Sequence, residues 1–347
     1  MRASKWSTPP VVVLGDITVD IFAQIEALPK PGDDCLSPGL ELHCGGVAAN
    51  AALALAKWGV PVRLLGCTGR DCFARIALDF LRRAGIDVSG VRQTERALTG
   101  LMFIVVSPGG QRTIFGSRGA NAVLQATAAD AGYLNEAGAA HLVGYNYLTA
   151  SVAAAADRLV EGARRRGAQV SLDVGMEPSR KVWQKVLQVV RKVDILFVSQ
   201  AEATALTGKN NEGRALAALR ACGPREVVLK LGEEGCLLLE GAAVHKVPPF
   251  AVRVADTTGA GDAFAAAFLR ARLSGWPPTE AALVANAAGA AAASVMGAGE
   301  RVPSPGQIER LVRAGRLAKR WEPLRLRVLE RLKQEFRREE SGNRTGG

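Results

Sequence analysis

The stretch best equipped for chemistry is Asp256-Thr257-Thr258-Gly259-Ala260-Gly261-Asp262-Ala263-Phe264. It follows a strand-like run at residues 244–254 and begins an alanine-rich segment that is typical of a helix. The first amide groups of a helix lack intrahelical acceptors, so this end favours an anion, most naturally a phosphate. The two glycines around Ala260 let the backbone turn sharply and come close to such a ligand.

An acid within this cluster, Asp262, would repel a bound phosphate unless it takes a proton from an attacking hydroxyl group. Amide donors beside one carboxylate therefore indicate phosphoryl transfer to an alcohol, with Asp262 as the general base. The amides of Gly259, Ala260 and Gly261 would hold the developing negative charge. The alternative is structural: Asp256 or Asp262 only caps the helix, which is the commoner outcome for a short Gly-Ala-Gly-Asp motif taken alone.

A second glycine pair, Gly45-Gly46, precedes another apolar-periodic segment, and Asn50 lies one turn into the expected helix. An Asn side chain can both donate and accept hydrogen bonds, as the hydroxyl of a sugar requires. Upstream, a valine-rich run at residues 10–15 predicts a strand that leads to Asp20. Ligands gather at the carboxyl ends of strands in open α/β sheets, so Asp20 is a candidate acceptor for a hydroxyl. An Asp in a turn fits the same pattern equally well.

Strand and helix patterns alternate along the chain and must position these residues. The alternation predicts an α/β fold whose mostly parallel sheet carries helices on both faces. A hairpin is expected from residues 99–107 and 112–115, which alternate in polarity on either side of Pro108-Gly109-Gly110. Further strands are expected at residues 62–69, 141–145, 169–174, 194–198 and 226–230, and helices at 72–84, 152–166, 182–190, 202–206 and 281–298.

The composition argues against several classes of protein. The chain has 347 residues, of which 48% are hydrophobic, enough for one large α/β domain or two small ones. Its six cysteines include no Cys-x-x-Cys pair and its three histidines are scattered, which argues against a zinc site and favours a reducing cytoplasm. We find no signal peptide, and Asn286 and Ser294 interrupt the apolar run at residues 281–298. We therefore expect a cytoplasmic protein without a membrane span.

The formal net charge of +11 is concentrated at the C-terminal end, where residues 309–347 contain 12 Lys or Arg and 6 Asp or Glu. The rest of the chain is only mildly basic, which an anionic substrate such as ATP explains, so nucleic acid is not the expected partner. Leu324, Val328, Leu332 and Phe336 recur every four residues among arginines. This spacing predicts an amphipathic helix that packs on its own body or on the second subunit of a homodimer.

The nine residues from Asp256 to Phe264 resemble the C-terminal signature of the ribokinase-like (PfkB) family of sugar kinases, Asp-Thr-x-Gly-Ala-Gly-Asp-x-Phe. Residues 45–52 resemble the N-terminal signature of the same family, and the two stand in the family's order. The resemblance implies a kinase domain at residues 1–310, in which segments of about 21–43 and 99–116 form a small β-sheet lid. Residues 311–347 would form a basic helical extension.

The resemblance also implies which residues bind the two substrates. The sugar would lie against Asp20, Gly45, Gly46, Asn50 and Arg118, the last in a Ser-Arg-Gly-Ala-Asn element like the one after the ribokinase lid. The nucleotide would be bound by Ser199, Lys230, Gly232, Gly235, Gly261, Asn286 and Arg180. Ser199 stands where the family usually has Asn, and the element from Asp173 to Arg180 lacks the family's middle Asn.

Metal ions follow from the same resemblance. Glu202 would organise Mg²⁺ and its waters around the phosphates. Asp256 and Thr258 would bind a monovalent cation such as K⁺. The expected cofactors are therefore ATP and Mg²⁺, with K⁺ as a further candidate.

The implied activity is ATP-dependent phosphorylation of a primary hydroxyl of a small sugar. Asp20 and Asn50 suit a polyhydroxylated ring, so neutral sugars come first, with ribose ahead of fructose. 2-Keto-3-deoxygluconate comes second because Arg118 or Arg112 could pair with its carboxylate. Nucleosides come third because aromatic residues for stacking are sparse in the lid. From another class, the chain could be a catalytically silent sugar sensor, which would have no need of Asp262. Neither a phosphate-loop motif nor a Gly-x-Gly-x-x-Gly after the first strand is present.

Overall fold

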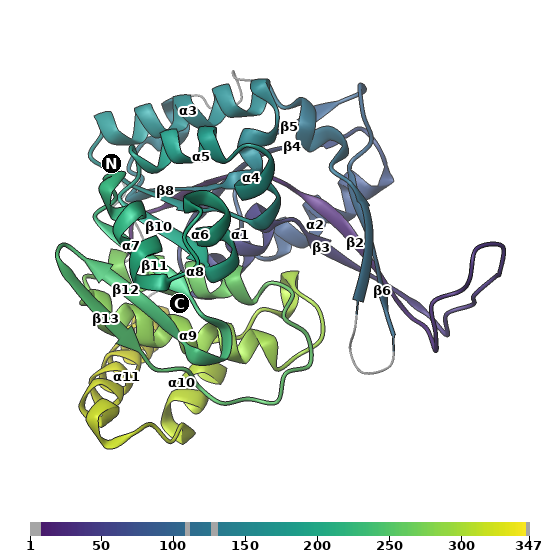
Figure 1. Ribbon diagram of the computed structural model, residues 1–347. Coiled ribbons are helices and arrows are strands. Elements are labelled where there is room, and N and C mark those ends of the chain that lie inside the picture. Colours follow the sequence, from purple (N-terminus) through teal and green to yellow (C-terminus); the bar gives the residue numbers. More distant parts are fainter. Residues whose placement is uncertain (1–7, 108–111, 126–130, 345–347) are drawn as a thin grey trace.

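A computed structural model describes residues 8–107, 112–125 and 131–344 of the chain. It contains a nine-stranded sheet between layers of helices and a four-stranded sheet that projects from one side (Figure 1). The predicted fold class, an α/β protein with a mostly parallel sheet and a small β lid, is confirmed.

The large sheet has the strand order β13-β12-β11-β10-β9-β8-β1-β4-β5. Neighbouring strands are parallel except for β11 with β12 and β12 with β13, which are antiparallel. The strands are β1 (Val11–Leu14), β4 (Val62–Gly69), β5 (Val91–Thr94), β8 (Ala139–Val143), β9 (Gln169–Asp173), β10 (Ile195–Ser199), β11 (Glu226–Lys230), β12 (Cys236–Glu240) and β13 (Ala243–Val247).

Helices cover both faces of this sheet because its strands are apolar on both sides. In β1, for example, Val11 and Val13 belong to one hydrophobic core and Val12 and Leu14 to the other. The first core is covered by α1 (Val47–Lys57), α2 (Cys72–Arg83), α8 (Ala260–Leu273), α9 (Pro278–Ala293), α10 (Pro305–Ala314) and α11 (Glu322–Arg344). The second is covered by α3 (Ala150–Arg165), α5 (Trp183–Val190), α6 (Gln200–Thr207) and α7 (Glu212–Ala221), and α4 (Met176–Lys181) leads into α5.

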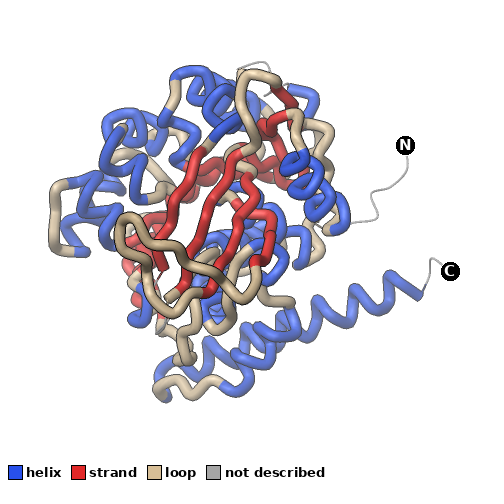
Figure 2. The backbone as a smooth tube through the Cα atoms, turned by 90° about the vertical axis from the view of Figure 1, so that its right-hand side faces the viewer, coloured by secondary structure: helices blue, strands red, loops and turns tan. Residues whose placement is uncertain are grey.

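The lid is the four-stranded sheet, with the order β3-β2-β6-β7. Its strands are β2 (Thr18–Gln24), β3 (Leu40–Gly45), β6 (Gly100–Val106) and β7 (Arg112–Ser117). Figure 2 looks onto this sheet, with the irregular segment between β2 and β3 in front of it. The strands β6 and β7 pair as the predicted hairpin, whose turn lies outside the described residues.

One expected strand is much shorter than the pattern suggested. The run at residues 244–254 is a strand only as far as Val247, and an irregular segment then leads to α8. Pro248 and Pro249 follow Val247 directly, and a proline has no amide hydrogen to donate to a neighbouring strand. The irregular segment can therefore bend away from the sheet and bring Asp256 to the start of α8.

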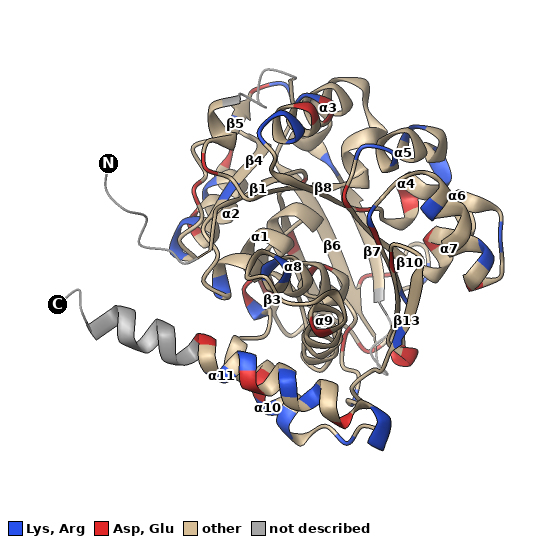
Figure 3. Ribbon diagram, turned by 90° about the vertical axis from the view of Figure 1, so that its left-hand side faces the viewer, with Lys and Arg blue, Asp and Glu red and all other residues tan. Residues whose placement is uncertain are grey.

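The C-terminal helices pack against the body of the chain, and Figure 3 shows charged residues along α10 and α11. Leu324, Val328 and Leu332 of α11 are buried in the same core as α9. Glu280 of α9 is buried beneath α11 and accepts hydrogen bonds from Arg327 (2.8 Å) and from Arg331. Within the described residues, no helix is long and apolar enough to cross a membrane.

We expect the Arg327→Met and Arg331→Met double variant to lose roughly 2–4 kcal/mol of unfolding free energy, because it leaves Glu280 buried without its cations. Adding Glu280→Gln should recover part of that loss. Urea unfolding measures both effects. The matched control is Arg82→Met, which removes an exposed pair with Asp79 and should cost no more than about 0.5 kcal/mol. An equal loss in control and double variant would show that these pairs do not hold α11.

Candidate active site

Asn50 and Asp262 meet although 212 residues separate them in the sequence. The Asn50 side-chain amide on α1 donates to Asp262 Oδ2 on α8, at 3.0 Å. Asn50 Oδ1 is buried and finds no hydrogen-bond partner within the part of the chain that the structure describes. The donor side of this amide therefore orients the carboxylate, and the acceptor side is available to a hydroxyl of a ligand.

Asp20 lies in β2, on the lid, and is not in a turn. Its Oδ1 accepts a hydrogen bond from the hydroxyl of Thr18 (2.7 Å). Burial raises the pKa of Asp20 to about 6, although the Thr18 hydrogen bond and the nearby His43 work in the opposite direction. Asp20 can therefore accept a hydroxyl proton or share one near neutral pH.

Gly45 and Gly46 are needed because other protein atoms lie very close to both residues. A Cβ atom at Gly45 would collide with the carboxylate of Asp20, so only glycine leaves room for that side chain. Gly46 has φ = 94° and precedes α1, and a Cβ there would collide with the carbonyl oxygen of Asp16. The motif thus positions Asp20 and begins the helix that carries Asn50.

The N-terminus of α8 lies beside a buried ammonium group. Gly259 precedes the helix with φ = 73°, in the left-handed region that favours glycine. A Cβ atom at Gly261 would lie 3.2 Å from Lys230 Nζ, so this glycine lets the ammonium approach the helix end. The amides of Gly259, Ala260 and Gly261 were predicted to bind an anion. The Ala260 amide already donates to the Thr257 carbonyl (3.2 Å).

Lys230 ends β11 and Asp173 ends β9, with β10 between the two strands. Lys230 Nζ lies 3.0 Å from each carboxylate oxygen of Asp173, and both side chains are largely buried. Burial lowers the pKa of Lys230, but the charges of Asp173 and Glu202 outweigh this effect and raise the pKa overall. Asp173 was not among the predicted site residues, although its position at the end of a strand was a usable signal.

The environment of Asp262 suits a group that exchanges protons near neutral pH. Burial raises its pKa to about 7, and the negative charge of Asp173 adds to this shift. The Asn50 hydrogen bond and the charge of Lys230 lower the pKa, and Asp20 raises it slightly. A carboxyl group with such a perturbed pKa, beside a cation and a second acid, is typical of a general acid or base.

Ser199 and Glu202 form a capping box at the start of α6. The Ser199 amide donates to Glu202 Oε2 (2.8 Å), and the Glu202 amide donates to Ser199 Oγ (3.3 Å). Burial raises the pKa of Glu202, an effect that the charge of nearby Lys230 partly offsets. Ser199 thus serves the helix end, and Glu202 contributes a negative charge close to Lys230 and Asp173.

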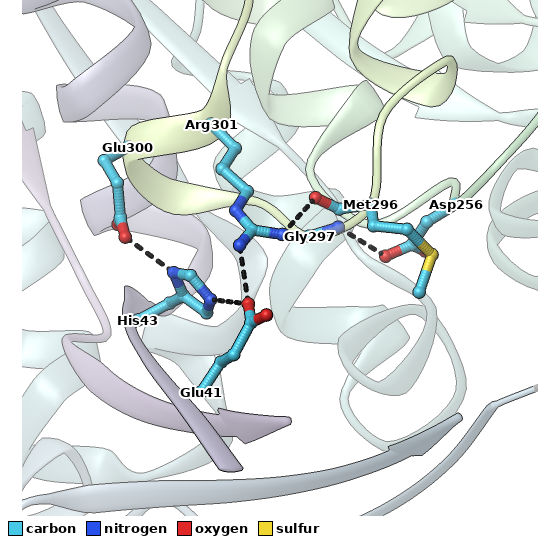
Figure 4. A network of polar contacts seen from close by, with 7 residues as sticks. All are labelled: Glu41, His43, Asp256, Met296, Gly297, Glu300 and Arg301. Atoms are coloured by element: carbon cyan, nitrogen blue, oxygen red, sulfur yellow. Dashed lines mark hydrogen bonds and ion pairs between the residues drawn. The ribbon is translucent and has the colours of Figure 1, made fainter. Parts of the chain in front are cut away.

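Asp256 joins the loop before α8 to the turn that follows α9. Its Oδ1 accepts hydrogen bonds from the amide (2.9 Å) and the hydroxyl (2.7 Å) of Thr258. Its Oδ2 accepts one from the amide of Gly297 (3.1 Å), as Figure 4 shows. Asp256 therefore fixes the backbone from which the residues at the α8 N-terminus extend.

Other predicted site residues are committed to protein partners. Arg118 donates to both carboxylate oxygens of Asp16, through Nε and Nη2, each at 2.7 Å. The buried Asn286 donates to the backbone carbonyls of Val247 (3.2 Å) and Pro248 (2.9 Å). Asn286 thus shapes the segment after β13 through its backbone.

The remaining predicted nucleotide residues lie near strand ends. Gly232 (φ = 60°) and Gly235 (φ = 87°) form the turn between β11 and β12, and a Cβ at Gly235 would collide with the Val247 carbonyl. Arg180 lies on α4 with an exposed side chain. Among the described residues, no group of three or more His, Cys, Asp or Glu could hold a metal ion by itself.

Residues 9–305 match the pfkB family carbohydrate kinases. The 2-dehydro-3-deoxygluconokinase of Thermoproteus tenax is 30% identical, over 90% of this chain and 98% of that protein. Fructokinase-1 of Oryza sativa subsp. japonica is 29% identical, over 87% of this chain and 97% of that protein.

Solved structures agree with these relatives. The ribokinase of Arabidopsis thaliana, complexed with ribose and ATP, superposes with a TM-score of 0.76 at 28% identity and covers 88% of this chain and 98% of its own. A candidate ribokinase II of E. coli, in complex with ATP and Mg²⁺, gives a TM-score of 0.79 at 25% identity and covers 87% of this chain and 98% of its own. The two signatures, the fold and the relatives agree: the chain belongs to the pfkB family of carbohydrate kinases.

Proposed function

We propose that this kinase transfers the γ-phosphoryl group of ATP to a primary hydroxyl of a small neutral sugar, with Asp262 as the general base. The observation that carries the proposal is the position of Asp262. Its carboxylate lies at the N-terminus of α8, is oriented by Asn50 at 3.0 Å and has a pKa raised by burial to about 7. A silent sugar sensor would have no use for a carboxylate tuned in this way.

The sugar is proposed to lie between the lid and the start of α1. Asp20 from the lid and Asn50 Oδ1 from α1 would accept hydrogen bonds from its hydroxyl groups, and Gly45 leaves the room that the Asp20 carboxylate needs. When the hydroxyl oxygen attacks the γ-phosphorus, a new O–P bond forms, the bond from this phosphorus to the bridging oxygen breaks and ADP leaves. The hydroxyl proton passes to a carboxylate oxygen of Asp262. The Asn50 amide holds the other carboxylate oxygen, so that the base keeps its orientation.

The phosphates are proposed to lie at the N-terminus of α8, beside Lys230. The Gly259 and Gly261 amides and the Lys230 ammonium supply positive charge where the transferring group gathers negative charge. Ala260 would join them only if its amide leaves the Thr257 carbonyl. The turn of Gly232 and Gly235 and the exposed Arg180 would hold the rest of the nucleotide. Ser199 and Asn286 would act indirectly, because their side chains bond to the protein.

The donor set of this site suits Mg²⁺ that is bound mainly through water and phosphate oxygens. Glu202 is close enough to Lys230 and Asp173 for their charges to shift its pKa, and one carboxylate oxygen already accepts from Ser199. When bound, Mg²⁺ would neutralise charge on the phosphates, and Glu202 would orient its waters. Asp256 and Thr258 remain our proposed site for K⁺.

The charge balance around Arg118 favours a neutral sugar over an acidic one. Asp16 already satisfies this guanidinium through two hydrogen bonds, so a substrate carboxylate would have to displace it. The 2-dehydro-3-deoxygluconokinase of Thermoproteus tenax, at 30% identity, keeps the acidic sugar as the second candidate.

The register of the lid argues against a nucleoside. Asp20 pairs with Met102 in β6, and the next residue, Ile21, pairs with Phe103, which in turn pairs with Phe115 in β7. Since neighbouring residues of a strand face opposite sides, Phe103 and Phe115 lie on the side of the lid away from Asp20. Neither of these rings can stack on a base beside Asp20. Phe22 shares the face of Asp20, but its ring is buried and packs edge to face against His43.

Comparing kcat/KM for ribose, fructose, 2-keto-3-deoxygluconate and adenosine tests this ordering. We expect the neutral sugars to be at least about tenfold better than the other two, which corresponds to ~1.4 kcal/mol of transition-state binding. A preference for adenosine of the same size would contradict the proposed substrate class. Absence of ATP turnover with every acceptor would contradict the proposed reaction.

Asp262→Asn should lower kcat by roughly 10²–10⁴-fold, because the variant keeps the shape of the side chain and loses the base. ATP affinity should stay unchanged or increase, because a negative charge leaves the phosphate site. Steady-state kinetics and calorimetric titration with ATP measure the two effects. The control is Asp79→Asn, which removes an exposed acid on α2. Near-normal turnover of Asp262→Asn would rule out the base.

The pH profile tests the electrostatic arrangement. The base works when deprotonated, so kcat/KM of the unaltered enzyme should rise with pH through about 7, the pKa of Asp262. Lys230→Met removes a charge that lowers this pKa, so its profile should move to higher pH by about 1 unit. Asp173→Asn removes a charge that raises the pKa, so its profile should move to lower pH. Shifts in the same direction would show that Asp262 does not set the profile.

A further inference from the structure

We infer that the turn formed by residues 296–303 is a clasp that joins the lid to the loop before α8, and that His43 and Glu300 are positioning residues for the transfer. The turn follows α9 and contacts three elements that carry predicted site residues. The predicted effect on catalysis rests on the proposed function. The contacts themselves are independent of it.

The first contact of the clasp is with lid strand β3. Figure 4 shows His43 between two acids: Nδ1 is 2.6 Å from Glu300 Oε1, and Nε2 is 3.0 Å from Glu41 Oε2. Arg301 Nη2 donates to the same Glu41 oxygen at 2.5 Å. Two residues of the turn and two of the strand therefore form one chain of charged hydrogen bonds.

The second contact is with the loop before α8. The Gly297 amide donates to Asp256 Oδ2 (3.1 Å), and Arg301 Nη1 donates back to the Met296 carbonyl (3.1 Å), as Figure 4 also shows. Asp256 in turn holds both the amide and the hydroxyl of Thr258. The Arg301 guanidinium thus links the Glu41 carboxylate of the lid to the backbone of the turn, and the Gly297 amide of this turn binds Asp256 in the loop before α8.

The third contact is with the end of α1, the helix that carries Asn50. Lys57 Nζ donates to the Glu300 carbonyl (3.0 Å), and Trp58 Nε1 donates to the Pro303 carbonyl (3.0 Å). The turn is therefore anchored on the body as well as on the lid. A clasp that is fixed at both ends can set the distance between Asp20 on the lid and Asp262 on the body.

The backbone of the turn packs directly against the backbone of lid strand β3. Gly299 has φ = 63°, and a Cβ atom there would collide with the Cys44 carbonyl of β3. Cys44 directly precedes Gly45, the residue that borders the Asp20 carboxylate. His43 pairs with Asp20 across the two strands, so both side chains lie on the same face of the lid. Movement of β3 relative to the turn must therefore move the surroundings of Asp20.

The charge of His43 decides the strength of the clasp. The hydrogen bond to Glu300 raises the pKa of His43, burial lowers it and the contact with Glu41 raises it again, with a net increase above 6.5. The other charged groups that face the ring are Arg301 of the turn and Asp20 of β2. The clasp is therefore complete below the ordinary pKa of histidine and weakens as the pH rises through the increased pKa of His43.

Hydrogen exchange on the free protein and steady-state kinetics test the inference with four variants: Glu300→Gln, His43→Gln, the double variant and the control Glu95→Gln. The control removes one acid of an exposed pair with Arg70 outside the lid. Both single variants should make the amides of β3 exchange at least about tenfold faster, and the double variant should exchange no faster than either, as expected of two groups in one interaction.

In the kinetics, both single variants should raise KM for the sugar about fivefold or more and leave KM for ATP within about twofold. The increase should shrink at pH values above the His43 pKa, where the unaltered enzyme loses the clasp as well. Unaltered exchange of β3 in Glu300→Gln, or equal increases of both KM values, would overturn the inference. The exchange arm needs no substrate, so it can support the clasp even if the unaltered enzyme phosphorylates no sugar.

Discussion

The site depends on one carboxylate that is held among other acids at the positive end of a helix. Asp262 lies close enough to Asp173 and Asp20 for both charges to raise its pKa. The hydrogen bond from Asn50 and the charge of Lys230 lower this pKa. Lys230 can do so because Asp173 fixes its ammonium at 3.0 Å. The same acid that repels Asp262 therefore positions the cation that stabilises it. Burial is the largest cause of the increase in the pKa of Asp262 to about 7, and these two charges act on it in opposite directions.

Glycines allow charged groups to come close to the backbone, both at the α8 N-terminus and at the lid. Gly261 leaves the space through which Lys230 reaches the α8 N-terminus, and Gly45 leaves the space occupied by the Asp20 carboxylate. Gly299 plays the same part where the turn after α9 meets the lid. In each case a Cβ atom would have to displace a charged group or a backbone carbonyl. The glycines of the two signatures thus act by letting charged groups come close, in addition to allowing tight turns.

The local patterns were sufficient to predict the parallel sheet and the hairpin of β6 and β7. The lid and the common site of the two signature motifs were implied by the family resemblance. The local patterns could not show Asp173 with Lys230, because that contact depends on which strand lies between β9 and β11 in the finished sheet. His43 and Glu300 are 257 residues apart, and no periodicity connects them. Strand β13 was overestimated because its apolar pattern continues past Pro248 and Pro249, where hydrogen bonding to a neighbouring strand stops.

The residues that we propose around the nucleotide fall into two groups. Some use their side chains to hold the protein backbone, and others direct a charge toward the proposed site. Ser199 caps α6 and Asn286 holds the carbonyls after β13, so the polar groups of both are already used by the protein. Lys230, in contrast, brings a full charge to the edge of α8, where the helix dipole also favours an anion. In the proposed arrangement the Lys230 cation binds the phosphates, and a charged donor binds phosphate more strongly than a neutral one. We therefore propose that Lys230 compensates for Ser199, whose side chain is shorter than the family's Asn.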